Sequence, residues 1–256
     1  HLYQVCWIRN VHMVRMDGMS IIRTIKRLWS KRSPEAYIDW MRSEGCRIGK
    51  GTKIFARPSV VFVDTTRPWL IDIGENVQIT GGVKILTHGY DWSVLKGIYG
   101  EVYGSAGKVT IGSNCFIGMN ALIMKGATIG DNCVIGSGSI VTGTIPPNSV
   151  AVGNPARVIC SIEDFREKRC RAQKAEAKQL VQEYYRVFGK RPSEDVLSEF
   201  FWLFASREKT LRESFVGKMK CVNNYEESMR VFLNSTPEFN SYEDFLNFCF
   251  EDISEK

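Results

Sequence analysis

The hexapeptide "THGYDW", residues 87–92, contains the only histidine beyond the first twelve residues, since the other two are His1 and His12. An imidazole titrates near neutral pH, so a positioned histidine can take a proton from a hydroxyl group. The residues that follow His88 combine aromatic rings with a carboxylate, a mixture suited to stacking on a sugar ring and binding its hydroxyl groups: Tyr90, Asp91 and Trp92. A lone histidine can equally be structural. The interpretation therefore depends on the elements that position His88.

A repeat of six residues surrounds this histidine. Aliphatic residues open successive blocks of residues 111–146, and the same spacing occurs twice upstream. A helix requires apolar residues at a period of 3.6 and a half-buried strand at a period of 2, so neither fits. The first positions of the blocks are Ile48, Ile54, Val60, Ile73, Ile79, Ile85, Ile111, Ile117, Ile123, Ile129, Ile135 and Val141. The fifth positions are repeatedly small: Thr52, Val77, Val83, Cys115, Ala121, Ala127, Cys133 and Ser139.

A strict period of six predicts a mainly β fold, in which short strands are joined by sharp corners, three strands to a coil. Eighteen residues then complete one triangular coil, and coils stack about 4.8 Å apart through parallel strand pairing. The first position of each block points inward. Cys115 and Cys133 are eighteen residues apart, so we expect them to lie one above the other as corner residues. A functional thiol pair is the alternative.

Helices are predicted before the repeat, in residues 20–44. Ile21, Ile25, Leu28 and Trp29 lie at helical intervals, and Pro34 after Ser33 is a typical helix start. Gly45 is a typical stop. This pattern predicts two short helices that cap the first coil. Their lysine and arginine side chains face solvent or, alternatively, a membrane surface.

A helical extension is predicted after the repeat. Ser161 and Asp164 form the start signal of a long helix that runs to about Phe188, with Gly189 as its end. We also expect a helix from Ser193 through Phe204 and two more near residues 225–234 and 242–252. The predicted division is therefore an N-terminal segment (1–44), a β-helix domain (45–160) with an excursion loop (88–108), and a helical extension (161–256).

Composition excludes several classes of protein. Of the 256 residues 44% are hydrophobic and 24% charged, as in ordinary globular proteins. The net charge is +6, and the positive excess lies in the first 160 residues, which favours a phosphorylated ligand or an anionic surface. No basic run is interleaved with aromatic residues, which argues against nucleic acid. No apolar run approaches the roughly 20 residues of a membrane span, and the opening stretch does not read as a signal peptide.

The eight cysteines are scattered without C-x-x-C pairs, so no metal site is predicted. Reduced thiols in a cytoplasmic protein are the simplest interpretation.

The six-residue rhythm breaks twice, at residues 62–70 and at residues 88–108. A loop that interrupts a rigid repeat carries function more often than a regular corner does. His88 lies at the root of the second and longer break, where the scaffold still determines its position. This loop root is the candidate site.

The chain from Ile48 to Val158 resembles the hexapeptide-repeat acetyltransferases, particularly the galactoside, maltose and xenobiotic O-acetyltransferase group. The matching signs are the "IGxN" blocks, the "TH" followed by an excursion loop, and the closing "IVTGTIPPNSVAVGNPARVI". The resemblance implies a left-handed parallel β-helix and a homotrimer that binds acetyl-CoA, the acyl donor, in grooves between neighbouring columns, with no metal required. The C-terminal extension is not part of the common pattern and only loosely resembles tails of some surface-polysaccharide acetyltransferases.

The resemblance also implies roles for individual residues. His88 matches the family histidine, the general base that takes a proton from the acceptor hydroxyl. We expect a backbone carbonyl or a carboxylate to hold its tautomer, and Asp64, from the first break, is our candidate. A backbone N–H beside the groove would stabilise the developing negative charge. A structural role for His88 remains the alternative.

For coenzyme A the matching positions are Met119, Ser137 and Thr142 along the groove, with Arg157 for a phosphate. Met119 departs from the small polar residue often found at its position. Tyr90, Asp91 and Trp92 are the candidates for the acceptor; many relatives have a second histidine in this stretch. Arg157 as a surface charge and Trp92 as loop packing are the alternatives.

The expected function is acetyl transfer from acetyl-CoA to a hydroxyl of a saccharide, in the synthesis of a surface polysaccharide or glycan. An N-acyltransferase acting on a sugar nucleotide is a close alternative. A non-catalytic trimeric scaffold is another, although "TH" and "GNPAR" together argue against it. A γ-type carbonic anhydrase needs three histidines on zinc, which this sequence does not offer.

Overall fold

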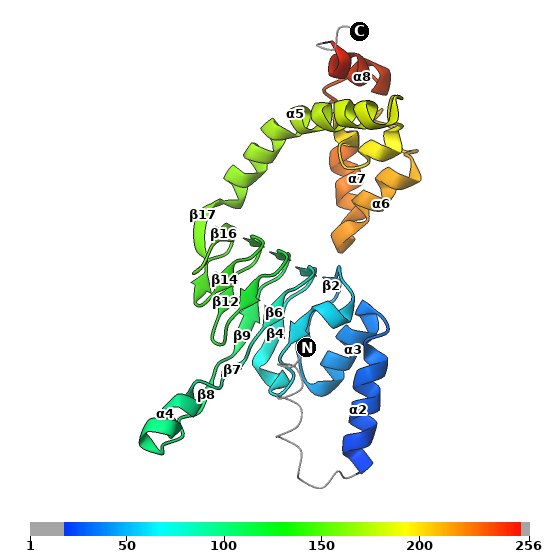
Figure 1. Cartoon of the computed structure of the whole chain (residues 1–256). Helices are drawn as coiled ribbons and strands as arrows, with labels where there is room; N and C mark the ends of the chain where they lie inside the picture. The colour runs from blue at the N-terminus through cyan, green and yellow to red at the C-terminus, as the bar shows by residue number, and fades with distance from the viewer. Residues whose placement is uncertain (1–17, 252–256) are drawn as a thin grey trace. The chain divides into compact units, whose positions relative to one another are not determined.

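The computed structural model describes residues 18–251, with side chains from Thr24 onward. Residues 1–17, which include His1 and His12, and residues 252–256 lie outside the described part. By its internal contacts the chain divides into two units, His1–Ile159 and Cys160–Lys256 (Figure 1). Each unit is described separately below.

The first unit is a three-sided parallel β-helix. Its first two coils are β1 (Arg47–Ile48), β2 (Lys53–Ile54), β3 (Phe62–Val63) and then β4 (Ile71–Ile73), β5 (Gln78–Ile79), β6 (Lys84–Ile85). Two further coils are β9 (Val109–Ile111), β10 (Phe116–Ile117), β11 (Leu122–Ile123) and β12 (Thr128–Ile129), β13 (Val134–Ile135), β14 (Ile140–Val141). The column ends with β15 (Thr144–Ile145), β16 (Ser149–Val152) and β17 (Arg157–Ser161).

Three sheets form the faces of this column. Face 1 has the order β1-β4-β9-β12-β15, face 2 the order β2-β5-β10-β13-β16-β17, and face 3 the order β3-β6-β11-β14. Strands of successive coils pair in parallel and in register, so that Ile117 lies opposite both Ile79 and Ile135. The predicted repeat of six residues is therefore confirmed, and each repeat corresponds to one short strand and the corner that follows it.

The interior of the column is a stack of aliphatic side chains. From Ile73 onward every predicted first position is buried, and the fifth positions beside them are buried too. Of the earlier first positions, Ile54 is buried and Ile48 is partly buried. Val60 is 53% exposed, and Val63 is buried in its place, at 4% exposure. A 3₁₀ turn, η1 (Pro58–Val60), adds residues to the first coil, so Val63 occupies the internal position above Ile85. The prediction for Val60 was wrong for this reason.

Asparagines form the corners of one edge. Four of them adopt the left-handed conformation, which asparagine tolerates better than other non-glycine residues: Asn76, Asn114, Asn132 and Asn148. Asn120 also adopts it, but at the corner between faces 2 and 3, where its N–H donates to the Gly81 carbonyl. Asn114 Nδ2 donates to Asn132 Oδ1 at 2.9 Å, and Asn132 Nδ2 donates to Asn148 Oδ1 at 2.9 Å. The "IGxN" pattern thus supplies both the turn and a ladder of amides from coil to coil.

Cys115 and Cys133 follow two of these asparagines and lie in adjacent coils, as the pairing of Phe116 with Val134 shows. Both thiols are buried. The Cys115 thiol donates to the Gly130 carbonyl at 3.1 Å, and the Cys133 thiol to the Pro146 carbonyl at 3.1 Å. These contacts are those of corner residues.

Two helices precede the column, α2 (Gly18–Ser30) and α3 (Pro34–Glu44). Ser33 Oγ accepts a hydrogen bond from the Ala36 N–H at the start of α3, and Gly45, with φ 112°, ends it. The buried side chains of α3 belong to the same core as Ile54 and Val63: Tyr37, Ile38, Trp40 and Met41.

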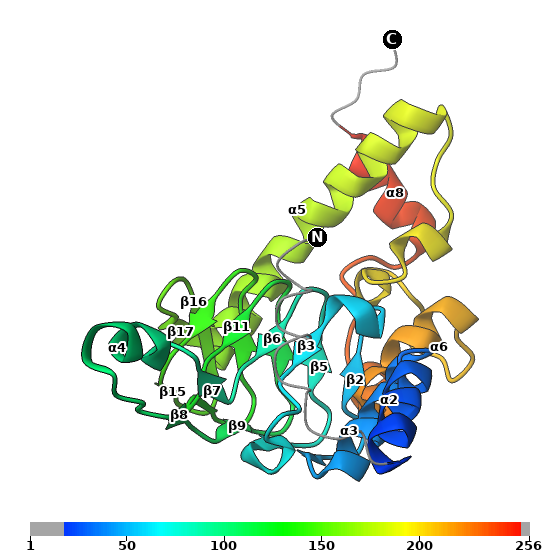
Figure 2. The ribbon, with the colours of Figure 1, turned by 60° about the horizontal axis from the view of Figure 1, so that its bottom comes forward.

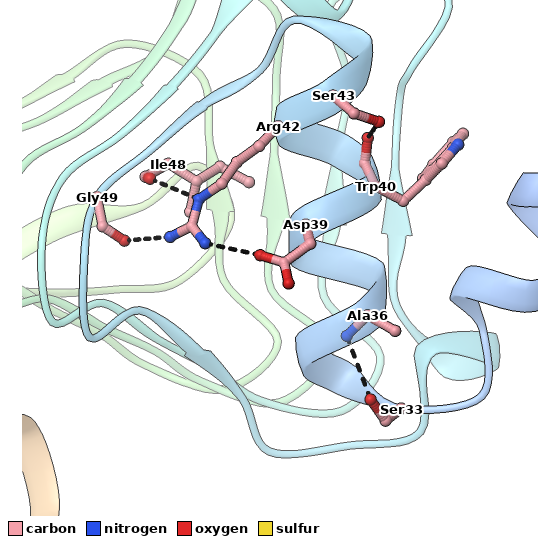
Figure 3. Close-up of polar contacts among 8 residues, drawn as sticks. All are labelled: Ser33, Ala36, Asp39, Trp40, Arg42, Ser43, Ile48 and Gly49. Carbon is pink, nitrogen blue, oxygen red and sulfur yellow. Dashed lines mark hydrogen bonds and ion pairs between the residues drawn. The ribbon is translucent and has the colours of Figure 1, made fainter.

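Helix α3 is fastened to the first coil by Arg42. Its guanidinium donates to the carbonyls of Ile48 (3.0 Å) and Gly49 (2.9 Å) and to Asp39 (3.0 Å) (Figure 3). Helix α3 lies beside β1 and β2, at the end of the column where the coils begin (Figure 2). Helix α3 therefore covers the end of the hydrophobic core that lies before the first coil and that no other coil covers.

The long break leaves the column as an antiparallel ribbon, β7 (His88–Gly89) with β8 (Ser105–Ala106). Helix α4 (Trp92–Tyr99) lies at the end of this ribbon, away from the column (Figure 1). None of the side chains of α4 is buried. The shorter break contains a second 3₁₀ turn, η2 (Pro68–Leu70).

The second unit is helical and has its own core. Helix α5 (Ile162–Phe188) begins with a capping box between Ser161 and Asp164 and ends at Gly189. The other helices are α6 (Glu213–Met219), α7 (Tyr225–Leu233) and α8 (Tyr242–Phe250), with 3₁₀ turns η3 (Glu194–Leu197), η4 (Phe201–Leu203) and η5 (Cys221–Asn223). No helix within residues 18–251 is long and apolar enough to cross a bilayer.

The expected helix from Ser193 through Phe204 was wrong. The chain forms two short 3₁₀ turns there, and Ser193 makes no capping hydrogen bond. Leu203, Phe204 and Ala205 are all buried. Three successive residues cannot share one face of an α-helix, so burial of this aromatic run favours the irregular path. Helix α6 had no counterpart among the predictions.

Candidate active site

Both breaks in the repeat leave the column at one corner, the corner after face 3. Its backbone hydrogen bonds run in register: Asp64 N–H to the Ile85 carbonyl, Leu86 N–H to the Ile123 carbonyl, and Met124 N–H to the Val141 carbonyl, each 2.9 Å. We call this corner, through Asp64, Leu86, Met124 and Thr142, the loop corner. It brings together residues that are distant in the sequence.

His88 and Asp64 are in direct contact at the loop corner. The His88 Nδ1 atom lies 2.6 Å from Asp64 Oδ2. The Asp64 side chain is 2% exposed and that of His88 is 19% exposed. The two residues that sequence reasoning assigned to one catalytic pair are thus neighbours.

Asp64 is held by a shell of hydrogen-bond donors. Its Oδ1 accepts from the backbone N–H of Thr66 at 3.1 Å and from the Thr66 hydroxyl at 2.7 Å. Its Oδ2 accepts from the backbone N–H of Thr87 at 3.1 Å and from the Thr87 hydroxyl. Burial acts to raise the pKa of Asp64, but the hydrogen bonds from Thr66 and Thr87 outweigh it and lower the pKa to about 2. Asp64 is therefore ionised at neutral pH.

An ionised carboxylate can only accept hydrogen bonds, so His88 must donate from Nδ1. This contact selects the tautomer with its proton on Nδ1 and makes Nε2 the basic nitrogen. A carboxylate in this position also stabilises the imidazolium that forms when Nε2 takes a proton. The pair has the arrangement that general-base catalysis requires.

Thr66 and Thr87 were missed by sequence reasoning. Thr66 follows the aspartate by two positions in "VDTT", a spacing typical of a side chain that closes a turn on its own backbone. Thr87 is the first residue of "TH", and it is fully buried. The geometry explains why Thr87 and His88 are adjacent in the sequence. Thr87 donates hydrogen bonds to the Asp64 carboxylate, and His88 contacts the same carboxylate through Nδ1.

The candidate acceptor residues follow His88 directly. The rings of Tyr90 and Trp92 lie 4.7 Å apart at an angle of 59°. The Asp91 side chain folds over Gly89, because a Cβ atom on Gly89 would lie 2.5 Å from Asp91 Oδ1 and 3.6 Å from the Cε of Lys125. Lys125, from the loop corner of the next coil, is a cation beside this site that the sequence did not indicate.

The candidate coenzyme A residues are all exposed: Met119, Ser137, Thr142 and Arg157. Thr142 belongs to the loop corner. Met119 and Ser137 lie at the other edge of face 3, where the Gly138 N–H donates to the Met119 carbonyl at 2.7 Å. Arg157 is on β17, and its guanidinium donates to the Ala156 carbonyl at 2.9 Å. A single chain therefore does not gather the four residues in one place.

The "GNPAR" segment closes the edge of β14, where face 3 ends. Ile140 N–H donates to the Gly153 carbonyl at 2.9 Å, and the Ala156 N–H donates to the Ile140 carbonyl at 2.8 Å. Ser139 Oγ accepts from the Gly153 N–H at 3.1 Å. The motif thus has a structural role that a scaffold would also need. By itself, therefore, the motif does not distinguish an enzyme from a scaffold.

Comparison with known proteins assigns this chain to a family. The signature of bacterial transferase hexapeptides (six repeats) matches residues 108–143. Protein CapG of Staphylococcus aureus is 39% identical over 130 residues, which cover 51% of this chain and 74% of CapG. Galactoside O-acetyltransferase of Escherichia coli K12 is 42% identical over 122 residues, 48% of this chain and 58% of that protein.

Among solved structures, a maltose O-acetyltransferase from Clostridium difficile 630 superposes with a TM-score of 0.43 and 28% identity, over 57% of this chain and 89% of that one. On the sequence relatives, the chain belongs to the hexapeptide-repeat acetyltransferases, a family of acyltransferases.

Proposed function

We propose that this protein transfers the acetyl group of acetyl-CoA to a hydroxyl of a saccharide, with His88 as the general base. The observation that carries the proposal is the buried, ionised Asp64 at 2.6 Å from His88 Nδ1. Membership of the family supports acetyl-CoA as the donor. The galactoside O-acetyltransferase among its relatives supports a saccharide acceptor, and aromatic rings beside His88 suit one.

The pair performs one proton transfer in each direction. A hydroxyl group is a weak nucleophile because its pKa lies far above neutral pH. Nε2 of His88 takes the hydroxyl proton while the oxygen forms its bond to the thioester carbon that acetyl-CoA supplies. His88 then gives that proton to the sulfur as the carbon–sulfur bond breaks. Such proton transfer contributes roughly 10²–10⁴-fold to the rate.

The donor is proposed to bind in a homotrimer of left-handed columns, as family resemblance implies. Ser137 and Thr142 offer exposed hydroxyls and Arg157 an exposed guanidinium, groups that suit the phosphates of coenzyme A. Met119 and Ser137 lie at the opposite edge of face 3 from Thr142. Packing columns side by side would bring the edge of one copy to the loop corner of another.

The central test is a thiol-release assay with acetyl-CoA and a panel of saccharides, comparing wild type with His88→Ala. We expect the variant to lose about 10²-fold or more in kcat. Its circular dichroism spectrum should be unchanged, because His88 is not part of the internal stack. Equal rates would remove His88 from the mechanism. Turnover with amino-sugar nucleotides alone would favour N-acylation.

A second measurement separates the enzyme from a scaffold. Coenzyme A should raise the melting temperature of the wild-type protein, since a ligand that binds only the folded state stabilises it. The shift should be smaller in Arg157→Ala. Absence of any shift in the wild type would favour the scaffold.

A further inference from the structure

Helix α2 carries an unusual distribution of charge. Between Gly18 and Pro34 the sequence has no Asp or Glu, while its basic residues are Arg23, Lys26, Arg27, Lys31 and Arg32. The described basic side chains of this stretch, from Lys26 onward, are exposed. Residues 18–34 therefore carry cations with no acidic residue among them.

The same helix exposes its apolar face. Ile25 is 51% exposed, Leu28 67% and Trp29 66%. These residues are spaced by three and four positions, so they lie on one side of the helix. Ser30, on the other side, is buried, and its hydroxyl donates to the Arg27 carbonyl at 2.8 Å. An ordinary surface helix buries its apolar stripe, whereas α2 turns this stripe away from the column.

We infer that α2 docks on an anionic lipid surface. Ile25, Leu28 and Trp29 enter the boundary between headgroups and acyl chains, and the flanking cations contact lipid phosphates. Tryptophan suits this depth because its ring is amphipathic. The Arg32 guanidinium, 5.5 Å from the centre of the Trp29 ring, places a cation at the edge of the apolar patch.

Charge selects this occupant over a second copy of the chain. A symmetric pair of α2 helices would bring two wholly basic stretches together, and like charges repel. An anionic bilayer complements them and accepts the apolar side chains at the same time. This inference does not depend on the proposed acetyl transfer, because it concerns binding and a separate part of the chain.

The test is co-sedimentation of the full chain with phosphatidylcholine vesicles, with and without phosphatidylglycerol. We expect binding to the anionic vesicles only, weakened by high salt because the attraction is screened. Leu28→Ser with Trp29→Ser should weaken binding about tenfold or more. Trp69→Ser is the matched control, since Trp69 is also a largely exposed tryptophan of the first unit.

A second variant tests the charges. Lys26→Glu with Arg27→Glu should abolish binding, whereas Arg166→Glu with Lys168→Glu on α5 makes the same change in net charge and should leave it nearly intact. Quenching by brominated lipids, compared between wild type and Trp29→Phe, reports whether Trp29 itself enters the bilayer.

Three results would overturn the inference: no binding of the wild type to either vesicle, equal binding to both, or binding that the α2 variants do not change. A change of oligomeric state in the α2 variants without a change in vesicle binding would assign the face to contacts between copies instead. Both variants alter exposed side chains, so we expect their melting temperatures to match the wild type.

Discussion

A single carboxylate determines what His88 can do. Asp64 accepts from Thr66, Thr87 and the imidazole at once, so it stays ionised although it is buried. An ionised acceptor at Nδ1 selects one tautomer of the histidine and makes Nε2 its basic nitrogen.

Asp64→Asn keeps the size of the side chain but removes the charge that orients His88. We expect kcat to fall about 10²–10⁴-fold with little change in KM, because the wrong tautomer impairs proton transfer rather than binding. The ¹⁵N shifts of the imidazole should show the change of tautomer directly. Asp72→Asn is the control, since Asp72 is a surface carboxylate that pairs with Arg47 and Lys108. A rate within twofold of the wild type would contradict the assignment.

Thr66→Val removes one donor from the carboxylate. A hydrogen bond to a charged group contributes about 1.5–3 kcal/mol, so the variant should lose stability of this order at neutral pH. The pKa of Asp64 is about 2 in the folded protein, below the value of about 4 in an unfolded chain. The stabilisation is therefore complete above pH 4 and is lost as pH falls from about 4 through about 2.

Urea unfolding at neutral and acidic pH measures this loss. The difference between wild type and Thr66→Val should shrink in acid, whereas Thr128→Val, at an exposed position of β12, should show a small difference at both pH values. A difference that does not depend on pH would mean that Thr66 contributes packing alone.

The sequence indicated His88 and Asp64 because both lie in breaks of a regular pattern. It could not indicate Thr66, Thr87 or Lys125, because nothing local shows that these side chains meet around one corner. Their proximity arises from the stacking of coils that are 22 and 38 residues apart at this corner, from Asp64 to Leu86 and from Leu86 to Met124.

At the scale of elements, the strands were predictable because burial in a three-sided coil recurs every six residues. The corners were less so. The asparagine ladder along one edge combines a backbone conformation with a side-chain contact, and the sequence shows only the recurring "N". The prediction placed Val60 inside the column because the 3₁₀ turn η1 adds residues between two strands, and nothing in the sequence shows this addition.

Asn132 tests what the ladder contributes. Asn132 has φ 57°, which alanine adopts at a cost of about 1–2 kcal/mol and glycine adopts freely. Both Asn132→Ala and Asn132→Gly lose the amide contacts to Asn114 and Asn148. We expect the alanine variant to be less stable than the glycine variant by about 1 kcal/mol in urea unfolding.

The matched comparison is Lys84, an exposed residue of extended β6. At Lys84 we expect the alanine variant to be more stable than the glycine variant, because glycine loses more conformational freedom than alanine when it is fixed in a strand. If alanine were the more stable replacement at Asn132 too, the corner conformation would not limit stability.

For the whole molecule, the column is a rigid support from which two irregular segments leave at the same corner. The aliphatic stack, the α3 cap and the "GNPAR" closure all maintain the column, and the proposed catalytic pair of His88 and Asp64 lies at its loop corner. The helical unit has a separate aromatic core. Residues Phe201–Leu203 form a 3₁₀ turn and pack into this core, although the local sequence pattern predicts an α-helix. Burial against residues distant in the sequence determines their path, and a local pattern does not show such burial.

Helix α4 has a consequence for how the activity should be assayed. Eight residues without a buried side chain do not form a stable helix alone in water. We therefore expect contacts with another chain to stabilise α4, and a neighbouring column of the proposed trimer is the candidate. Turnover per chain should then fall on dilution as trimers dissociate, while far-ultraviolet spectra of the column persist. Specific activity measured against protein concentration, beside sedimentation velocity, would show whether the two decline together.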